Sequence, residues 1–190
     1  MTRRRPRPAF RASLADERGL AAVEFSLLLP AFCLLLVGTI DLGGVLLTKF
    51  RLNQAVSAGA NYAIVNAASV GSGGGASLAS TIAGILSTSN AVSTTTGSVV
   101  INNGPTATVA TSGTTPSGTA ANADLYYCPT LSGTTLTWGT GTSAKGTCTG
   151  GVQSGKFVQI VAQQSYSPVF SGYGLVQSGT ISSRAVVQVQ

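Results

Sequence analysis

The stretch FSLLLPAFCLLLVGTI, residues 25–40, contains no charged side chain. With its flanks, the chain from Leu20 to Leu47 is apolar except for Glu24 and Asp41. A helix needs roughly 17–25 apolar residues to cross a bilayer. About 26 Å of helix separates the two acids at a rise of ~1.5 Å per residue, so each can lie near one membrane interface. The stretch therefore predicts one membrane-spanning helix, with Asp41 at the interface where the helix leaves the membrane.

The basic residues are concentrated before this span. Six arginines and two acids lie in the first 18 residues, which gives this segment +4 of the +6 net charge of the chain. The positive-inside rule predicts a cytoplasmic N-terminus, with everything after about residue 48 on the outer side. A nucleic-acid-binding protein would need its basic residues on the folded domain. The arrangement instead favours a targeting leader. A conventional signal-peptide site at Ala58-Gly59-Ala60 lies too far beyond the apolar run.

Three short patterns carry a resemblance to a known family. The first is Arg18-Gly19-Leu20-Ala21-Ala22-Val23-Glu24-Phe25, followed by a Leu-rich run that contains a proline. The second is GTIDLG at residues 38–43, and the third is LNQAVSAGANYA at residues 52–63. Over about residues 18–67 the chain resembles TadE-like proteins, the minor pseudopilins of tight-adherence (Flp-type) pilus systems. Leu42 departs from the family pattern, which usually has Phe there.

The resemblance implies that a prepilin peptidase cuts between Gly19 and Leu20, so that Glu24 becomes the fifth residue of the mature chain. A free ammonium on Leu20 would lie one helical turn from the Glu24 carboxylate, on the same face. The carboxylate could equally pair with the ammonium of a neighbouring subunit.

The resemblance also implies a location and a set of partners. The location is the bacterial inner membrane, crossed once, with the C-terminal domain in the periplasm; incorporation into an extracellular pilus stays open. The implied partners are the prepilin peptidase, other minor pseudopilins, the major Flp-type pilin and the pilus assembly platform. The implied function is that of a minor pilin-like subunit in a tight-adherence pilus or a type IV pilus-related secretion system.

Small residues recur every fourth position beyond the span, at Ala55, Gly59, Ala63 and Ala67. Such a stripe lets another backbone approach closely. Two interpretations are open: the stripe packs against helices of other subunits, or it packs beneath the protein's own sheet. The helix is expected to end near Ser69, before a glycine-rich break.

The rest of the chain predicts a small outer domain. Apolar residues at helical spacing indicate a short helix over about residues 76–87. Short β-prone segments follow, at Ser98–Ile101, Ala107–Thr111, Thr134–Trp138, Phe157–Ala162 and Ile181–Val189. We therefore expect an α+β, pilin-like fold in which a long N-terminal helix packs against a small antiparallel sheet. Its parts are a leader (1–19), the long helix (20–69, with the span at about 25–47) and a β-rich domain (70–190).

The cysteines agree with an exported domain. Cys33 lies in the predicted span, whereas Cys128 and Cys148 lie in the outer domain, 20 residues apart. An oxidising periplasm favours a disulfide between the latter two. Closing a loop of that size stabilises the fold by about 3 kcal/mol in the chain-entropy model.

Nothing in the sequence points to catalysis. The chain has no histidine, and Asp124 is the one acid of the outer domain. Two cysteines do not complete a tetrahedral metal site, so we expect neither a metal nor another cofactor. The main alternative to a pilus subunit is a membrane-anchored adhesin or ligand-binding β domain, with aromatic residues on its binding surface. The candidates are Tyr126, Tyr127, Trp138, Tyr166, Phe170 and Tyr173.

Overall fold

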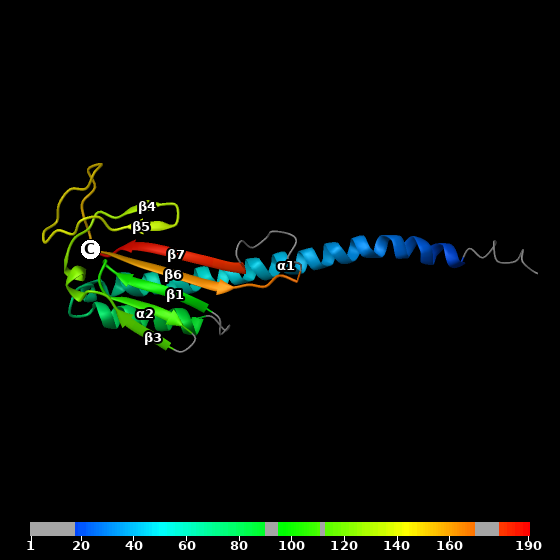
Figure 1. Cartoon of the computed structure of the whole chain (residues 1–190), viewed down its shortest axis with the longest axis horizontal. Coiled ribbons are helices and arrows are strands. Elements are labelled where there is room, and N and C mark those ends of the chain that lie inside the picture. Colours follow the sequence, from blue (N-terminus) through cyan, green and yellow to red (C-terminus); the bar gives the residue numbers. More distant parts are fainter. Residues whose placement is uncertain (1–17, 90–94, 111–112, 170–178) are drawn as a thin grey trace, which may run out of the picture.

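The structure is a computed structural model that describes residues 18–89, 95–110, 113–169 and 179–190. Residues 1–17 of the predicted leader (1–19) lie outside the described residues, and so do Phe170 and Tyr173. A single helix, α1 (Arg18–Val65), dominates the N-terminal third and continues through Pro30 without a break. Its first half projects away from the rest of the protein (Figure 1). By length and composition, α1 is long and apolar enough to cross a membrane.

The outer domain is built on a five-stranded sheet. Its strands lie in the order β3-β2-β1-β6-β7, and each neighbouring pair is antiparallel. The strands are β1 (Thr95–Ile101), β2 (Thr106–Ala110), β3 (Gly113–Ser117), β6 (Phe157–Ser165) and β7 (Thr180–Gln188). The second half of α1 packs against β6 and β7, and α2 (Gly75–Ser89) packs against β1, β2 and β3. The expected α+β architecture is confirmed.

The core lies between the sheet and these two helices. Alternate residues of the central strands face it, as shown by the paired and fully buried Val99 and Ile160. Leu52 contributes from α1, and Ile82 contributes from α2, each without exposed surface. The two helices cover one face of the sheet, whereas the opposite face carries exposed polar side chains such as Thr96 and Gln163.

A loop-rich region, residues 118–156, forms what we call the distal lobe. It contains a 3-10 helix (Ala120–Asp124) and a hairpin of β4 (Thr130–Ser132) and β5 (Thr135–Thr137). The lobe lies at the end of the domain opposite the projecting half of α1, near the C-terminus (Figure 1). The predicted disulfide between Cys128 and Cys148 is present there, with the two Cα atoms 5.6 Å apart.

Five predicted β segments correspond to β1, β2, β5, β6 and β7, whereas β3 and β4 were not predicted. β3 has the sequence GTTPS, which includes a proline and no large apolar residue, so it forms through its pairing with β2. The helix α1 begins two residues before Leu20 and ends at Val65, and a short 3-10 helix (Ala67–Ser69) follows. The glycine-rich break then folds as a compact turn, closed by a hydrogen bond from Gly75 N to Gly71 O.

Candidate functional site: the N-terminal helix and its attachment to the domain

The predicted processing segment lies in the first turns of α1. Leu20 is 62% exposed, and a Cβ added at Gly19 would meet no other atom within 4 Å. Glu24 is also exposed, one helical turn beyond Leu20. The structure therefore places Leu20 and Glu24 on one exposed face of the helix.

The exposed surface continues along the helix on every side. Large apolar side chains are 41–74% exposed from Phe25 to Leu36, and none of the best membrane-spanning window is buried. A helix that is apolar all round must be covered by lipid or by other protein. The Cys33 thiol lies on this exposed part of α1.

Asp41 lies where α1 meets the domain, and only 1% of its surface is exposed. Its carboxylate Oδ1 accepts a hydrogen bond from Val169 N at 2.8 Å. The Tyr166 hydroxyl donates to the Asp41 carbonyl oxygen at 3.1 Å. The segment after β6 is therefore tied to the helix at the point where the exposed span ends. We call this arrangement the exit clamp and define it as Asp41, Gly44, Tyr166 and Val169.

A glycine at position 44 makes room for the exit clamp. A Cβ on Gly44 would collide with the Tyr166 phenol, whereas a Cβ on Gly43 would meet nothing within 4 Å. The sequence placed Asp41 at the membrane interface but did not reveal its partners in residues 166–169. No pattern around Asp41 in the sequence points to these partners, which lie 125 and 128 residues further along the chain.

The small-residue stripe lies inside the protein. Ala55 and Ala63 are buried, and a Cβ added at Gly59 would lie 2.9 Å from Ile82 Cγ2 and 3.3 Å from Ile160 Cδ1. These three positions therefore let α1 approach α2 and β6 closely. Ala67 lies beyond α1 and is partly exposed, and its carbonyl accepts a hydrogen bond from Gln190 Nε2 at 2.9 Å. Of the two interpretations left open by the sequence, this geometry favours packing beneath the protein's own sheet.

Polar contacts reinforce the attachment of α1 to β7. Lys49 Nζ donates to the Ser182 carbonyl oxygen, and Ser183 Oγ donates to Asn53 Oδ1 at 2.7 Å. The α1 residues of both contacts, Lys49 and Asn53, follow the exit clamp in the helix and lie in the half that packs on the domain. The helix is thus fixed to the C-terminal strand by its polar as well as its apolar side chains.

Asn102 is a structural residue in the turn between β1 and β2. It is fully buried, and its Nδ2 donates to the carbonyl oxygens of Ala123 and Leu125 at 3.0 and 2.6 Å. Its Oδ1 accepts from Phe157 N at 3.1 Å. Asn102 therefore joins the β1–β2 turn to the distal lobe and to the start of β6. Its φ of 48° is tolerated because asparagine enters the left-handed region more readily than most residues.

In the distal lobe, Asp124 holds the turn that follows α1. Ser72 N donates to Asp124 Oδ1 at 2.8 Å. Hydrogen bonds from Ser72 lower the pKa of Asp124, and the charge of Lys156 contributes in the same direction. The Lys156 ammonium is buried and donates to the Val70 carbonyl oxygen at 3.1 Å. These contacts give Asp124 a structural role in joining the lobe to the end of α1.

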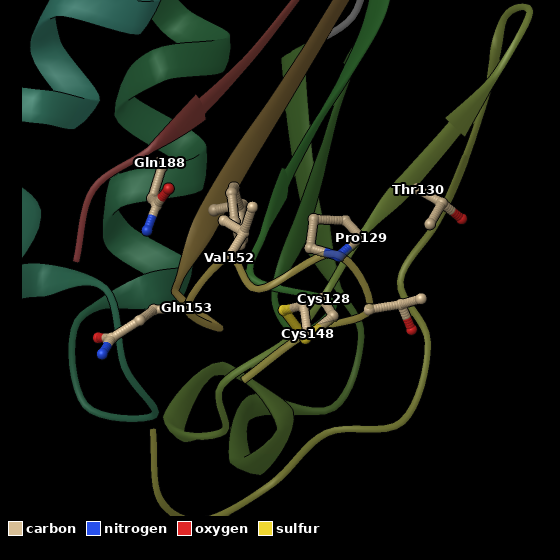
Figure 2. A pocket seen from close by; sticks show the side chains of 9 residues that line it. Cys128, Pro129, Thr130, Cys148, Val152, Gln153 and Gln188 are labelled. Carbon is tan, nitrogen blue, oxygen red and sulfur yellow. A yellow bond between two sulfur atoms is a disulfide. The ribbon is translucent and has the colours of Figure 1, made fainter. Parts of the chain in front are cut away.

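The aromatic residues of the lobe pack against their neighbours. The Tyr127 and Trp138 rings meet edge to face with their centroids 5.8 Å apart, and Tyr127 is buried. The Tyr126 ring lies 5.6 Å from Lys156 Nζ. A cavity of about 310 Å³ lies beside the disulfide, lined in part by Pro129, Val152 and Gln188 (Figure 2). Within the described residues, no group of three or more His, Cys, Asp or Glu side chains could hold a metal ion.

The site thus consists of an exposed apolar helix, long enough to cross a membrane, that continues into the core of a small domain with an antiparallel sheet. Residues 19–61 match the family model described as TadE-like protein. TadE-like proteins are structural components of pili and are not an enzyme family. No curated protein and no solved structure matches the chain. The family match ends before the outer domain begins.

Proposed function

We propose that this chain is a minor pilin-like subunit of a tight-adherence pilus or of a type IV pilus-related secretion system. The observation that carries the proposal is the family match from residue 19 to residue 61. That range begins at the proposed processing site and follows α1 through its exposed half into the core. In this proposal α1 anchors the protein in the bacterial inner membrane, with the N-terminus in the cytoplasm and the β-rich domain in the periplasm.

A prepilin peptidase cleaves the chain between Gly19 and Leu20 in this proposal. The accessibility of the bond supports it, because Leu20 is largely exposed and no side chain of the described residues packs on Gly19. The Glu24 carboxylate then pairs with an ammonium group, either that of its own Leu20 or that of a neighbouring subunit. Pairing offsets the cost of a carboxylate inside the bilayer, roughly 2.5–3.5 kcal/mol on insertion scales. The proposed partners are the peptidase, other pseudopilins, the major Flp-type pilin and the assembly platform.

N-terminal sequencing of the protein from membranes and from sheared pili tests this proposal. We expect a mature chain that begins at Leu20, and a Gly19→Val variant that keeps its leader. Gly38→Val is the matched control, because Gly38 also lies on the unpacked part of α1. An intact Met1 or Thr2 terminus in the wild-type protein would contradict the proposed processing.

A Glu24→Gln variant separates cleavage from assembly. We expect normal cleavage but at least a tenfold lower recovery with pilus components, since glutamine cannot neutralise an ammonium. Deletion of the gene tests the pilus role itself. Loss of pili supports an assembly subunit, whereas normal pili with lost attachment would instead indicate the adhesin alternative.

A further inference from the structure

The strand β7 forms one edge of the five-stranded sheet. Tyr166 N donates to Gly179 O, and Val189 N donates to Lys156 O. With the register of β6 and β7, these bonds show that the odd-numbered residues of β7 direct their backbone groups toward β6. The N–H and C=O groups of the even-numbered residues therefore point away from the sheet. Ser182 agrees with this assignment, because its carbonyl oxygen accepts a hydrogen bond from Lys49 instead of from β6.

The outward groups of Arg184, Val186 and Gln188 form an open edge. No backbone hydrogen bond from another described segment reaches them. The β4–β5 hairpin is drawn beside β7 in Figure 1, but it forms a separate two-stranded sheet. The opposite edge of the large sheet differs, because β3 is short and contains Pro116. Short strands and prolines are common means of blocking edge pairing, so β7 is the edge better suited to accept another strand.

The membrane anchor restricts which strand can pair there. All ladders of the sheet are antiparallel, and β7 runs away from the projecting half of α1 (Figure 1). An antiparallel β7 from a second copy would place the two exposed α1 segments at opposite ends of the joint sheet. Two copies in one membrane cannot do this. The other edge strand of a second copy, β3, is also unsuited. Neighbouring strands alternate in direction across the sheet, so β3 runs parallel to β7 and could not extend the antiparallel pattern from the same membrane.

The charges near β7 point to an acidic partner. Arg184 lies on the uncovered face of the sheet, opposite Val161, and its buried Nε atom has no hydrogen-bond partner in the described structure. From residue 48 onward, five basic residues stand against a single acid, Asp124. A second copy therefore offers few carboxylates, and a different protein must supply the charge that complements Arg184.

We propose that the edge of β7 from Arg184 to Gln188 binds an extended segment of a different membrane-anchored subunit. That segment runs toward the membrane, antiparallel to β7, and carries a carboxylate next to Arg184. Directly opposed side chains on paired strands lie about 4.5–5.5 Å apart, which suits such a pair. The cavity of about 310 Å³ beside Gln188 and Phe157 accepts an apolar side chain of the same segment. The inference rests on the proposed function only for the membrane anchor.

Site-specific photo-crosslinking of the full chain in its native membranes tests the proposal. The probe p-benzoyl-phenylalanine replaces Ser182 or Gln188, one at a time, and the control probe replaces Gln163 on the exposed face of β6. We expect the two β7 probes to label one anchored subunit other than this chain. The Gln188 probe should reach an earlier residue of that subunit than the Ser182 probe, as an antiparallel register requires. The Gln163 probe should give at least tenfold less adduct.

A pair of proline variants then tests whether backbone pairing is responsible. Val186→Pro removes an outward N–H group, so we expect at least a tenfold loss of the Gln188 adduct. Thr180→Pro also removes an outward N–H, but at the membrane-proximal end beyond the Lys49 contact, and should leave the adduct unchanged. Arg184→Glu should reduce the adduct about tenfold, whereas Arg184→Lys should retain most of it. Trp138 fluorescence confirms that each variant is folded.

Four outcomes would overturn the proposal: adducts with a second copy only, a parallel register, no adduct at the β7 probes, or an adduct that survives both Val186→Pro and Arg184→Glu. The N-terminus of the same samples is sequenced in parallel. A mature Leu20 terminus without a β7 adduct would reject strand addition and leave the proposed processing intact. A β7 adduct on an uncleaved chain would reject the proposed processing and support strand addition.

Discussion

The two halves of α1 are both apolar, yet they have opposite surroundings. In the first half Leu28 is 69% exposed, whereas in the second half Leu52 has no exposed surface. The first half carries large apolar side chains in every direction. The second half carries a buried face of small and medium apolar residues, and its exposed face carries polar residues such as Asn61 beside apolar ones such as Phe50 and Val65. A helix that is apolar all round requires lipid or partner helices, while a one-sided helix is completed by its own domain.

Truncation of one leucine in each half should show the largest difference. Leu52→Ala leaves a cavity in the core, which typically costs 2–5 kcal/mol. Leu28→Ala removes no packed contact of the domain and should leave its stability within about 0.5 kcal/mol. Urea unfolding in detergent, followed by the fluorescence of Trp138, the single tryptophan of the chain, measures both. Equal losses for the two variants would mean that the halves do not differ as the structure describes.

Two glycines offer a second matched pair. Gly59→Leu inserts a side chain where a Cβ alone would lie 2.9 Å from Ile82 Cγ2. Overpacking of this kind costs about 1–3 kcal/mol. Gly38→Leu adds a side chain where nothing lies within 4 Å, so the domain should unfold at the same urea concentration as the wild type. A destabilised Gly38→Leu variant would show that the exposed half also packs against the domain.

Alanine substitutions at the junction between the halves should have weaker effects, and the two neighbouring glycines should respond in opposite directions. Gly43→Ala should stabilise the helix by up to about 1 kcal/mol, because alanine is the better helix former. Gly44→Ala has the same helical gain but displaces the Tyr166 phenol. We expect the exit clamp to loosen and the Val169 amide, bonded to Asp41 in the wild type, to exchange its hydrogen at least threefold faster. NMR hydrogen exchange on full-length protein in micelles measures this, and unchanged Val169 exchange in Gly44→Ala would argue against the clamp.

The sequence predicted those features that depend on local patterns. The exposed half of α1 follows from an uncharged apolar run, and β7 follows from the alternation of Ile181 and Ala185 with polar residues. The disulfide follows from the two cysteines of the domain that the sequence predicts beyond the long helix. In each case the information lies within one segment or in the residue type itself.

The remaining features depend on contacts between distant segments. The exit clamp joins Asp41 to Val169, and Asn102 joins a turn to the distal lobe. β3 has no alternating pattern, and its ladder is defined by β2. The stripe at Gly59 showed that a close approach was needed, but not whether the approaching atoms would belong to the same chain. In the fold, the atoms next to Gly59 belong to α2 and β6 of the same chain.

The smallest effect is expected where the packed half of α1 ends, at the turn held by Asp124. Hydrogen bonds from Ser72 lower the pKa of this carboxyl in the folded protein, whereas the unfolded value is about 3.9. A lowered folded pKa means that the contribution to stability is present above the unfolded pKa and is lost as the pH falls through the folded value. Asp124→Asn should therefore unfold at a slightly lower urea concentration than the wild type near pH 6, and this difference in urea midpoint should shrink below pH 4. Because Asp124 is exposed, the effect should be smaller than that of either buried substitution. Urea midpoints of both proteins, measured across this pH range, decide the matter: a gap that stays constant with pH would show that the lost interaction does not depend on the carboxylate charge.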